Sequence, residues 1–358
     1  MTTTPSSASR THPSSPFTHL PFFYGWVVVG VAFVTMAIGV NTRTAFSLLF
    51  PPILAEFGWD RGQTAGAFSV GFIAAICSAP LIGVLMDRFG PRLVIPFGAI
   101  LVSTGLVLAT YVSQPWHLHL TLGVLVGGGT IFMSYVGHSL FLPYWFVRKR
   151  GLAIGIAFSG VGAGSIILFP WLQSYILRVG WRQACWALAV ILLVIVIPPN
   201  LLLQRRRPED LGLAPDGDLA SGWNPSAHTR GDNVVDPVWA ATDWTLALAV
   251  RTSRFWWLFL SYFVSLYAWY AVQVHQTKYL GDIGFAPGLA AYALGLVGLT
   301  GSVGQIILGH LSDRIGREWV WTISALGFAL CYALLLAMQW HPTPLLLYAM
   351  IAAQGVLG

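Results

Sequence analysis

Long apolar segments follow one another through most of this chain of 358 residues, of which 56% are hydrophobic and only 9% charged. A soluble domain carries about 25% charged residues. A helix that crosses a bilayer needs about 20 mostly apolar residues, because in lipid the backbone must satisfy its own polar groups. The sequence therefore predicts an all-α membrane protein with nine complete spans and a partial tenth. These spans are expected at about 22–47, 63–85, 93–112, 119–142, 151–176, 183–203, 255–276, 287–311, 319–340 and 345–358.

The last apolar segment reaches Gly358 before it is long enough to cross a bilayer. A helix that ended there would leave carbonyl groups unsatisfied in hydrocarbon. We therefore expect the sequence to be part of a longer protein. An inactive truncated transporter is the alternative.

The basic residues predict the orientation. If the N-terminus lies inside, most of the 19 Lys and Arg residues fall on the inner side, with dense groups at Arg148–Arg150 and Arg205–Arg207. Inner loops of membrane proteins carry this excess, so the charge is not a nucleic-acid signal. The three cysteines lie within apolar segments without metal-site spacing, and no cofactor or metal is expected.

Polar stretches divide the chain into four parts. Residues 1–21, rich in Ser, Thr and Pro, predict a disordered cytoplasmic tail. A first six-helix bundle is expected over 22–203, a cytoplasmic linker over 204–253, and an incomplete second bundle over 254–358.

The end of the linker contains a possible interfacial helix at 242–253, which Thr242 or Asp243 could cap. Its apolar side and flanking Arg residues suit the inner membrane interface. A short extension of the seventh span is the alternative.

A charged phrase occurs twice, each time directly after an apolar segment. Such a repeat indicates an internally duplicated bundle, the architecture of secondary transporters, with the substrate site between the halves. We expect Asp87 and Asp313 to cap helix N-termini at the inner mouth, so that the contacts close the inner side in one state and break in the other. The repeated residues are Gly83, Asp87, Arg88, Gly90 and Arg92 in the first copy, and Gly309, Asp313, Arg314, Gly316 and Arg317 in the second.

Further phrases narrow the class of transporter. They are Tyr24-Gly25-Trp26, the run from Phe50 to Trp59, Tyr144-Trp145-Phe146 with Arg148-Lys149-Arg150, Gly180-Trp181-Arg182, and the run from Arg207 to Leu213. Together they resemble the monocarboxylate and oxalate/formate antiporter branch of the major facilitator superfamily, in its bacterial form. The resemblance implies two six-helix halves in the plasma (bacterial inner) membrane and transport by alternating access.

Arg43 is the strongest candidate for substrate binding. It lies about 30 Å along the first predicted span, and cations inside a membrane usually face a cavity. Its guanidinium can hold a carboxylate through two hydrogen bonds, a role that the resemblance also implies. Snorkelling to the outer interface is the alternative. Asn41 lies on another face of the helix and is interpreted as a packing residue.

Two histidines are further candidates, because histidine titrates near neutral pH and can carry a proton. His275 has Tyr270 and Gln273 near the same helix end, and His138 shares a helix face with Tyr135. A structural role is the alternative for either histidine. Tyr144 and Gln305 are weaker cavity candidates.

The predicted spans contain no Asp or Glu away from their ends, which favours an anionic substrate over a cationic drug. The eighth span has neutral Ser302 and Gln305 where relatives often carry a cation, so a single carboxylate fits better than two. We therefore predict a carrier of small organic anions, chiefly monocarboxylates, with a proton or a second anion as partner. A transporter-like sensor is the rival, and no residue arrangement suggests an enzyme.

Overall fold

The computed structural model describes residues 22–217, 236–242 and 244–357, and this part of the chain is mostly helical without any strand. The predicted tail and the middle of the linker lie outside the described residues. The first-half helices are α1 (Gly25–Thr44), α2 (Phe46–Phe57), α3 (Arg61–Phe89), α4 (Pro91–Ala109), α5 (Pro115–Leu118), η2 (His119–Gly127), α6 (Gly128–Thr130), η3 (Ile131–Met133), α7 (Tyr135–Ser139), α8 (Leu142–Trp145), α9 (Arg150–Val179), α10 (Trp181–Ile191), η4 (Leu192–Val196) and α11 (Ile197–Leu203). The later helices are η5 (Pro208–Leu211), η6 (Pro215–Gly217), α13 (Pro237–Ala241), α14 (Leu246–Ala249), α15 (Ser253–Asp282), α16 (Pro287–Ile315), α17 (Arg317–Trp340), α18 (Pro344–Ala352) and η8 (Ala353–Leu357).

Within the described residues, 9 helical stretches are long and apolar enough to cross a membrane, and a shorter apolar stretch follows at Pro344–Leu357. This confirms the predicted set of spans. The first span differs from its prediction, because it continues to Phe57 instead of ending near residue 47. Ala45 keeps a right-handed helical backbone between α1 and α2, and Pro51 and Pro52 lie inside α2 without ending it.

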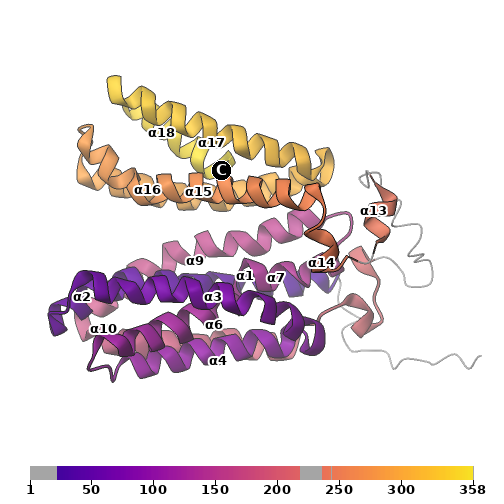
Figure 1. Ribbon diagram of the computed structural model, residues 1–358, viewed down its shortest axis with the longest axis horizontal. Coiled ribbons are helices and arrows are strands. Elements are labelled where there is room, and N and C mark those ends of the chain that lie inside the picture. The colour runs from indigo at the N-terminus through magenta and orange to yellow at the C-terminus, as the bar shows by residue number, and fades with distance from the viewer. Residues whose placement is uncertain (1–21, 218–235, 243, 358) are drawn as a thin grey trace, which may run out of the picture.

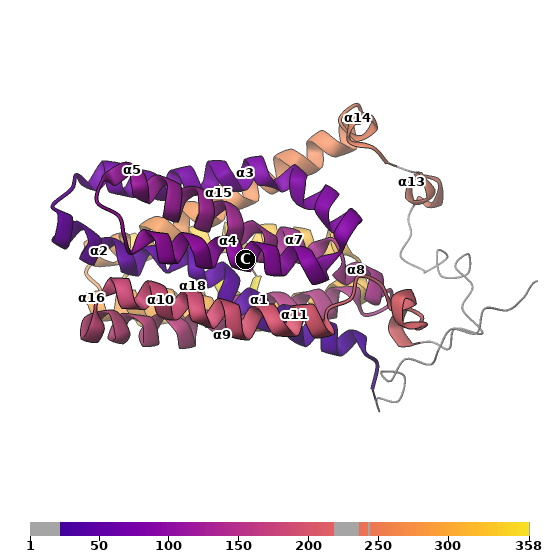
Figure 2. The same ribbon diagram turned by 90° about the horizontal axis from the view of Figure 1, so that it is seen from below.

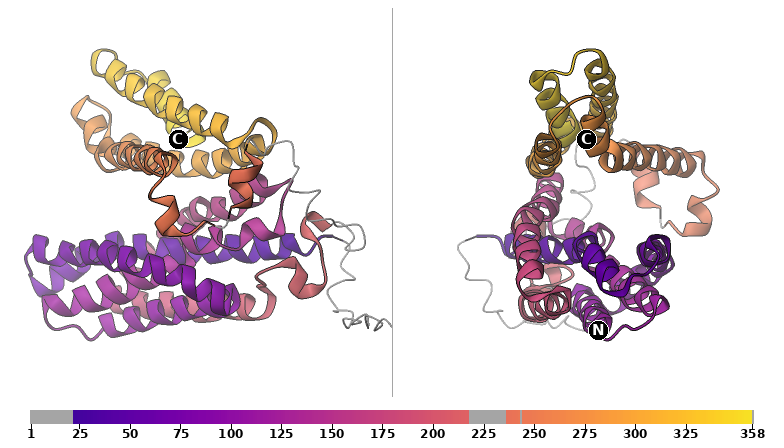
Figure 3. Two further views of the ribbon diagram at one scale, coloured as in Figure 1. Left: turned by 45° about the vertical axis from the view of Figure 1, so that its right-hand side comes forward. Right: turned by 90° about the vertical axis from the view of Figure 1, so that its left-hand side faces the viewer.

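The spans form two groups, each with its own buried apolar cluster. In Figure 1 the first group, α1 to α11, lies below the second group, α15 to α18, and their helices run along the long axis of the molecule. Helix α9 lies on the side of the first group that faces α16. Figure 3 shows the same pairing from the end of the bundle.

Glycines on two faces of α9 explain this pairing. A side chain at Gly155 would collide with the backbone of Gln305 in α16, and one at Gly160 would collide with the backbone of Phe33 in α1. Five residues separate the two glycines, which places them about 140° apart around the helix. Without side chains there, α9 can approach a helix of each group closely, as small residues allow in membranes.

The repeated phrase ends a helix in the same way in both groups. Gly90 lies between α3 and α4 with φ 71°, and Gly316 lies between α16 and α17 with φ 95°. Glycine adopts these backbone angles without the steric penalty of a Cβ atom. The chain therefore turns at matched positions directly after the two charged segments.

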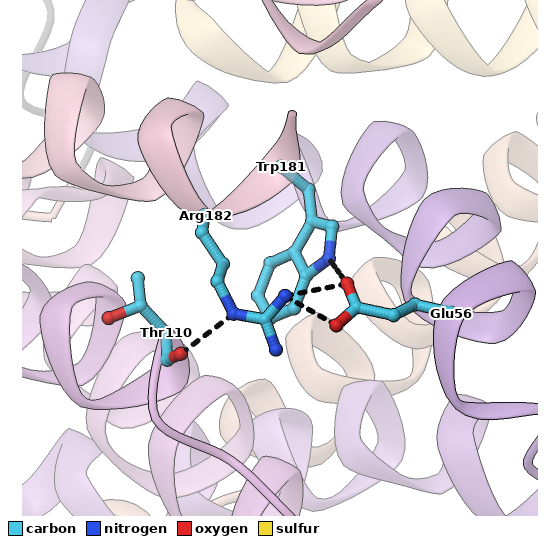
Figure 4. Close-up of polar contacts among 4 residues, drawn as sticks. All are labelled: Glu56, Thr110, Trp181 and Arg182. Carbon is cyan, nitrogen blue, oxygen red and sulfur yellow. Dashed lines mark hydrogen bonds and ion pairs between the residues drawn. The ribbon is translucent and has the colours of Figure 1, made fainter. Parts of the chain in front are cut away.

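A polar cluster joins three helices of the first group at the end opposite the repeated phrases (Figure 4). The Arg182 guanidinium contacts both carboxylate oxygens of Glu56 at 2.5 and 2.6 Å, and its Nε donates to the Thr110 carbonyl at 3.0 Å. The Trp181 indole also donates to Glu56, at 2.7 Å. The cluster ties the end of α2 to the start of α10 and to the end of α4.

Helices α13 (Pro237–Ala241) and α14 (Leu246–Ala249) of the linker lie at the end of the molecule where the repeated phrases also lie (Figure 2). The predicted helix at 242–253 is much shorter in the structure, because α14 covers only Leu246–Ala249 and its cap is Thr245, whose hydroxyl accepts from the amide of Leu248. Thr242 follows α13 in an extended conformation and is not the cap. The other predicted cap, Asp243, lies outside the described residues.

Asp236 connects the linker to the start of α15. Its carboxylate accepts from the Trp239 amide at 3.0 Å and pairs with Arg254 at 3.2 Å. The amide of Trp239 and then the guanidinium of Arg254 hold the pKa of Asp236 below its usual value. The carboxylate is therefore charged wherever this contact forms at neutral pH.

Candidate functional site

Arg43 lies near the middle of the first span, because that span runs from Gly25 to Phe57. At 1.5 Å per residue, about 27 Å of helix precede it and about 21 Å follow it. The guanidinium lies over two aromatic rings of α3, 4.1 Å from the ring centre of Phe72 and 5.8 Å from that of Phe68. The side chain is thus held by rings within the first group.

One polar side chain from another helix, Tyr270, interacts with this arginine, and two further polar side chains are linked to it through Tyr270. Tyr270 of α15 interacts electrostatically with Arg43 and with Tyr135 of α7. The Gln305 side chain of α16 lies near Tyr135, and its Oε1 has no hydrogen-bond partner among the described residues. We call Arg43, Tyr135, Tyr270 and Gln305 the central cluster. The first two residues come from the first group and the last two from the second, so the cluster lies where the groups meet.

The break in the fourth span positions Tyr135. Ser134 has an extended backbone, with φ −91° and ψ −174°, and its hydroxyl donates to the Ile131 carbonyl at 2.7 Å. A new helix, α7, then starts at Tyr135, whose ring meets Phe158 of α9 edge-on at 4.9 Å. The sequence suggested Tyr135, but it did not indicate this break.

Gln273 and His275 occupy different sides of α15. Gln273 is three residues from Tyr270 and thus about 60° away around the helix, whereas His275 is about 140° away. Gln273 is half-buried, and its Oε1 has no hydrogen-bond partner among the described residues. The exposed His275 instead lines a groove of about 250 Å³ between α15 and α17. The structure therefore does not bring His275 to Arg43.

His138 is fully buried within the first group. Its Nδ1 lies 3.0 Å from the Ser134 carbonyl, its ring is 5.5 Å from that of Phe141, and its Nε2 is enclosed without a hydrogen-bond partner among the described residues. Asn41 is also buried, and its amide bridges to the Val161 carbonyl of α9 at 2.8 Å, which confirms the packing interpretation.

The two copies of the charged phrase make different contacts. Asp313 accepts from the amides of Gly151 and Leu152, at 2.7 and 2.9 Å, and so caps α9 across the boundary between the groups. Asp87 instead pairs with Arg206 of the linker at 2.6 Å. The predicted helix cap is confirmed for Asp313, whereas the described contacts of Asp87 are with the linker.

The other residues of the phrases have simpler placements. Arg88 lies over the ring of Phe89, and Gly309 packs backbone to backbone against Gly151. The arginines are otherwise exposed at the helix ends, namely Arg88, Arg92, Arg314 and Arg317. Their gating role stays a prediction.

Sequence reasoning missed two features of this region. Phe68 and Phe72 hold Arg43, yet aromatic residues four apart in an apolar helix give no signal of contact with another helix. Asp216 of the linker also grips the loop before α9, at 2.9 and 3.0 Å from the amides of Arg148 and Val147. Only the unusual Pro215-Asp216-Gly217 turn could have drawn attention to it.

The described residues hold no group of three or more His, Cys, Asp or Glu side chains that could bind a metal ion. The central cluster is instead suited to binding, because it combines one guanidinium with hydroxyl and amide groups and aromatic walls. Such a set can hold an anion but supplies no nucleophile with an adjacent base.

A family model, described as "Major Facilitator Superfamily", matches residues 27–358. This chain belongs to the Major Facilitator Superfamily. The assignment confirms the predicted all-α membrane fold class of the superfamily. Its relatives and its fold are those of transporters, which are not enzymes.

Curated relatives of this superfamily member include monocarboxylate transporters. The chain is 29% identical to monocarboxylate transporter 12 of Homo sapiens over 337 residues, which cover 89% of the chain and 64% of that protein. It is 32% identical to monocarboxylate transporter 11 of Homo sapiens over 220 residues, which cover 61% of the chain and 45% of the relative. The chain thus spans less than two thirds of the length of these relatives.

Solved structures of the superfamily share the fold. The transporter FucP in its outward conformation aligns with a TM-score of 0.61 at 18% identity, over 93% of this chain and 82% of that one. The proton:xylose symporter XylE aligns with a TM-score of 0.57 at 17% identity, over 93% and 80%. These likenesses concern the fold alone.

Proposed function

We propose that this protein carries small organic anions, chiefly monocarboxylates, across the plasma membrane by alternating access. The observation that supports this most is Arg43, a cation near mid-span that two phenylalanine rings hold beside Tyr270 of the other half. A guanidinium in this position can bind a carboxylate through two parallel hydrogen bonds. The names of the curated relatives agree with this substrate class.

The charge of the site favours one carboxylate over two. Ser302 and Gln305, two polar residues near the middle of α16, are neutral. A second carboxylate would be desolvated there without a cation from α16, and burying an unpaired charge is costly. The aromatic rings around Arg43 are suited to the organic part of the substrate.

Alternating access would use the contact between α9 and α16. The Asp313 carboxylate holds the first turn of α9, and the dipole of that helix favours the negative charge. We propose that this contact closes the inner side in one state and is released in the other. The N-terminus would be cytoplasmic, and either a proton or an exchanged anion would accompany the substrate.

Binding to Arg43 variants tests the anion site. The purified chain in detergent is titrated with L-lactate, benzoate and the dicarboxylate oxalate, and its thermal unfolding is followed. We expect the monocarboxylates to stabilise the wild type, and Arg43→Gln to weaken their binding by about 2 kcal/mol, or roughly 30-fold. Arg43→Lys keeps the charge but not the fork geometry, so it should restore only part of the affinity.

Arg178→Gln is the matched control, since it removes an exposed cation from the far end of α9. It should leave the titrations unchanged. Equal affinity of the wild type and of Arg43→Gln for the monocarboxylates would refute the anion site.

A further inference from the structure

The short loop before α9 is held by two carboxylates from different parts of the chain. Asp313, from the second half, accepts from the amides of Gly151 and Leu152. Asp216, from the linker, accepts from the amides of Val147 and Arg148 at 3.0 and 2.9 Å. Nothing in the proposed transport mechanism so far uses the second carboxylate.

The loop needs an external partner because its own backbone is irregular. Phe146 is extended, with φ −133° and ψ 129°, and Lys149 lies outside the helical region, with φ −110° and ψ 29°. The amides of Val147 and Arg148 therefore have no partner of the kind that a continuous helix would give them. Asp216 supplies the acceptor for both amides.

Asp216 itself is fixed in a conformation that favours this contact. It is the one non-glycine residue with positive φ in the described part of the chain, at φ 59°. Its side chain is only 7% exposed, and it also lies 3.8 Å from the Arg148 Nε atom. A buried carboxylate on a strained backbone, directed at two amides, indicates a specific role.

The linker before Asp216 is attached to the inner end of the first half. The indole of Trp145 donates to the Arg205 carbonyl at 3.2 Å, the hydroxyl of Tyr24 donates to the Leu203 carbonyl at 2.7 Å, and Arg206 pairs with Asp87. Asp216 therefore reaches the loop from a segment that is itself anchored, so it can act as a fixed support.

One side chain connects the two carboxylates. Arg150 begins α9, and its guanidinium lies near Arg317 as well as near Asp313 and Asp216. Its Nε also donates to the Phe146 carbonyl at 3.2 Å, at the start of the loop. Movement of the loop at the Asp216 contact would therefore also shift the loop at the Asp313 contact.

We propose that Asp216 is a positioning residue of the inner gate. It holds residues 146–150 so that the amides of Gly151 and Leu152 are presented to Asp313. The linker thereby favours the state in which the inner side is closed. This inference rests on the proposed alternating access, but its test needs no substrate.

The test measures how often the contact between α9 and α16 opens. Ser312 faces Gly151 across this contact and is half-buried, so Ser312→Cys serves as a reporter after Cys77, Cys185 and Cys331 have been replaced. The full chain is prepared in inside-out vesicles, whose outer surface is the cytoplasmic face of the membrane. A membrane-impermeant maleimide is added to the external medium, and the labelling rate is measured. Opening exposes the thiol, so the rate follows the open population.

Two variants remove the carboxylate while keeping the turn. Asp216→Asn tolerates positive φ, and Asp216→Gly relieves its strain, so neither should unfold the linker. We expect each to raise the labelling rate about fivefold, because hydrogen bonds to a charged acceptor are lost. Glu209→Gln, an exposed carboxylate of the same linker, is the matched control and should leave the rate unchanged.

A double variant tests whether the two carboxylates act together. Asp313→Asn alone should raise the labelling rate, and adding Asp216→Asn should raise it no further, since the support matters only while Asp313 grips the loop. Rates for both Asp216 variants equal to that of Glu209→Gln would overturn the proposal, as would independent, multiplying effects of the two aspartates. Arg43→Gln should not alter labelling, which separates this test from that of the anion site.

Discussion

At the scale of single residues, the structure gives Arg43 a setting that the sequence could only suggest. An arginine inside an apolar span is rare enough to stand out in a sequence, but its depth depended on where the span ended. The structure extends the apolar helical stretch to Phe57 and so places Arg43 near the middle of that stretch. Tyr270 comes from a helix more than two hundred positions later, and no local pattern could have paired it with Arg43.

Phe72 is expected to affect affinity although it carries no charge. Its ring centre lies 4.1 Å from the Arg43 guanidinium carbon, and a cation–π contact of this kind contributes about 1 kcal/mol. Phe72→Leu should therefore weaken monocarboxylate binding roughly fivefold in the thermal unfolding titration. Phe97→Leu, at an exposed ring of α4, is the control. Unchanged affinity in Phe72→Leu would show that the ring does not position the arginine.

At the scale of elements, α9 connects the two halves. Its glycines allow close packing on two faces, against α1 and against α16. The spacing in the sequence gives the faces but not their partners, because many helices in a bundle can accept a small-residue stripe. The length of the helix predicted at 242–253 was overestimated for a related reason. An amphipathic pattern does not show which residue will cap the helix.

The two faces of α9 should respond differently to an added side chain. Gly160→Leu collides with α1 inside the first half, where overpacking costs about 1–3 kcal/mol, so we expect a lower melting temperature and less monodisperse protein. Gly155→Leu collides with α16 and should instead raise labelling of the Ser312→Cys reporter. Gly30→Leu, at a position with open space around its Cβ, is the control. Identical behaviour of all three variants would contradict the assigned faces.

At the scale of the whole molecule, we propose that two helical groups meet at one substrate site. The number of spans and the duplication could be predicted from the sequence, because apolar length and a repeated charged phrase are local features. The sequence predicted that Asp313 caps a helix, but it did not indicate that this helix is α9. The contact of Asp216 with the loop before α9 was not predicted. It joins distant segments through backbone amides, and these give no signal in the sequence.

The most direct test of the central claim is counterflow in proteoliposomes. Vesicles containing the full chain are loaded with the unlabelled monocarboxylate that stabilises it most and are then diluted into a trace of the labelled compound. The account predicts transient accumulation of label inside, which is absent in Arg43→Gln and unchanged in Arg178→Gln. Binding without any accumulation would contradict transport and leave a protein that senses the anion without carrying it.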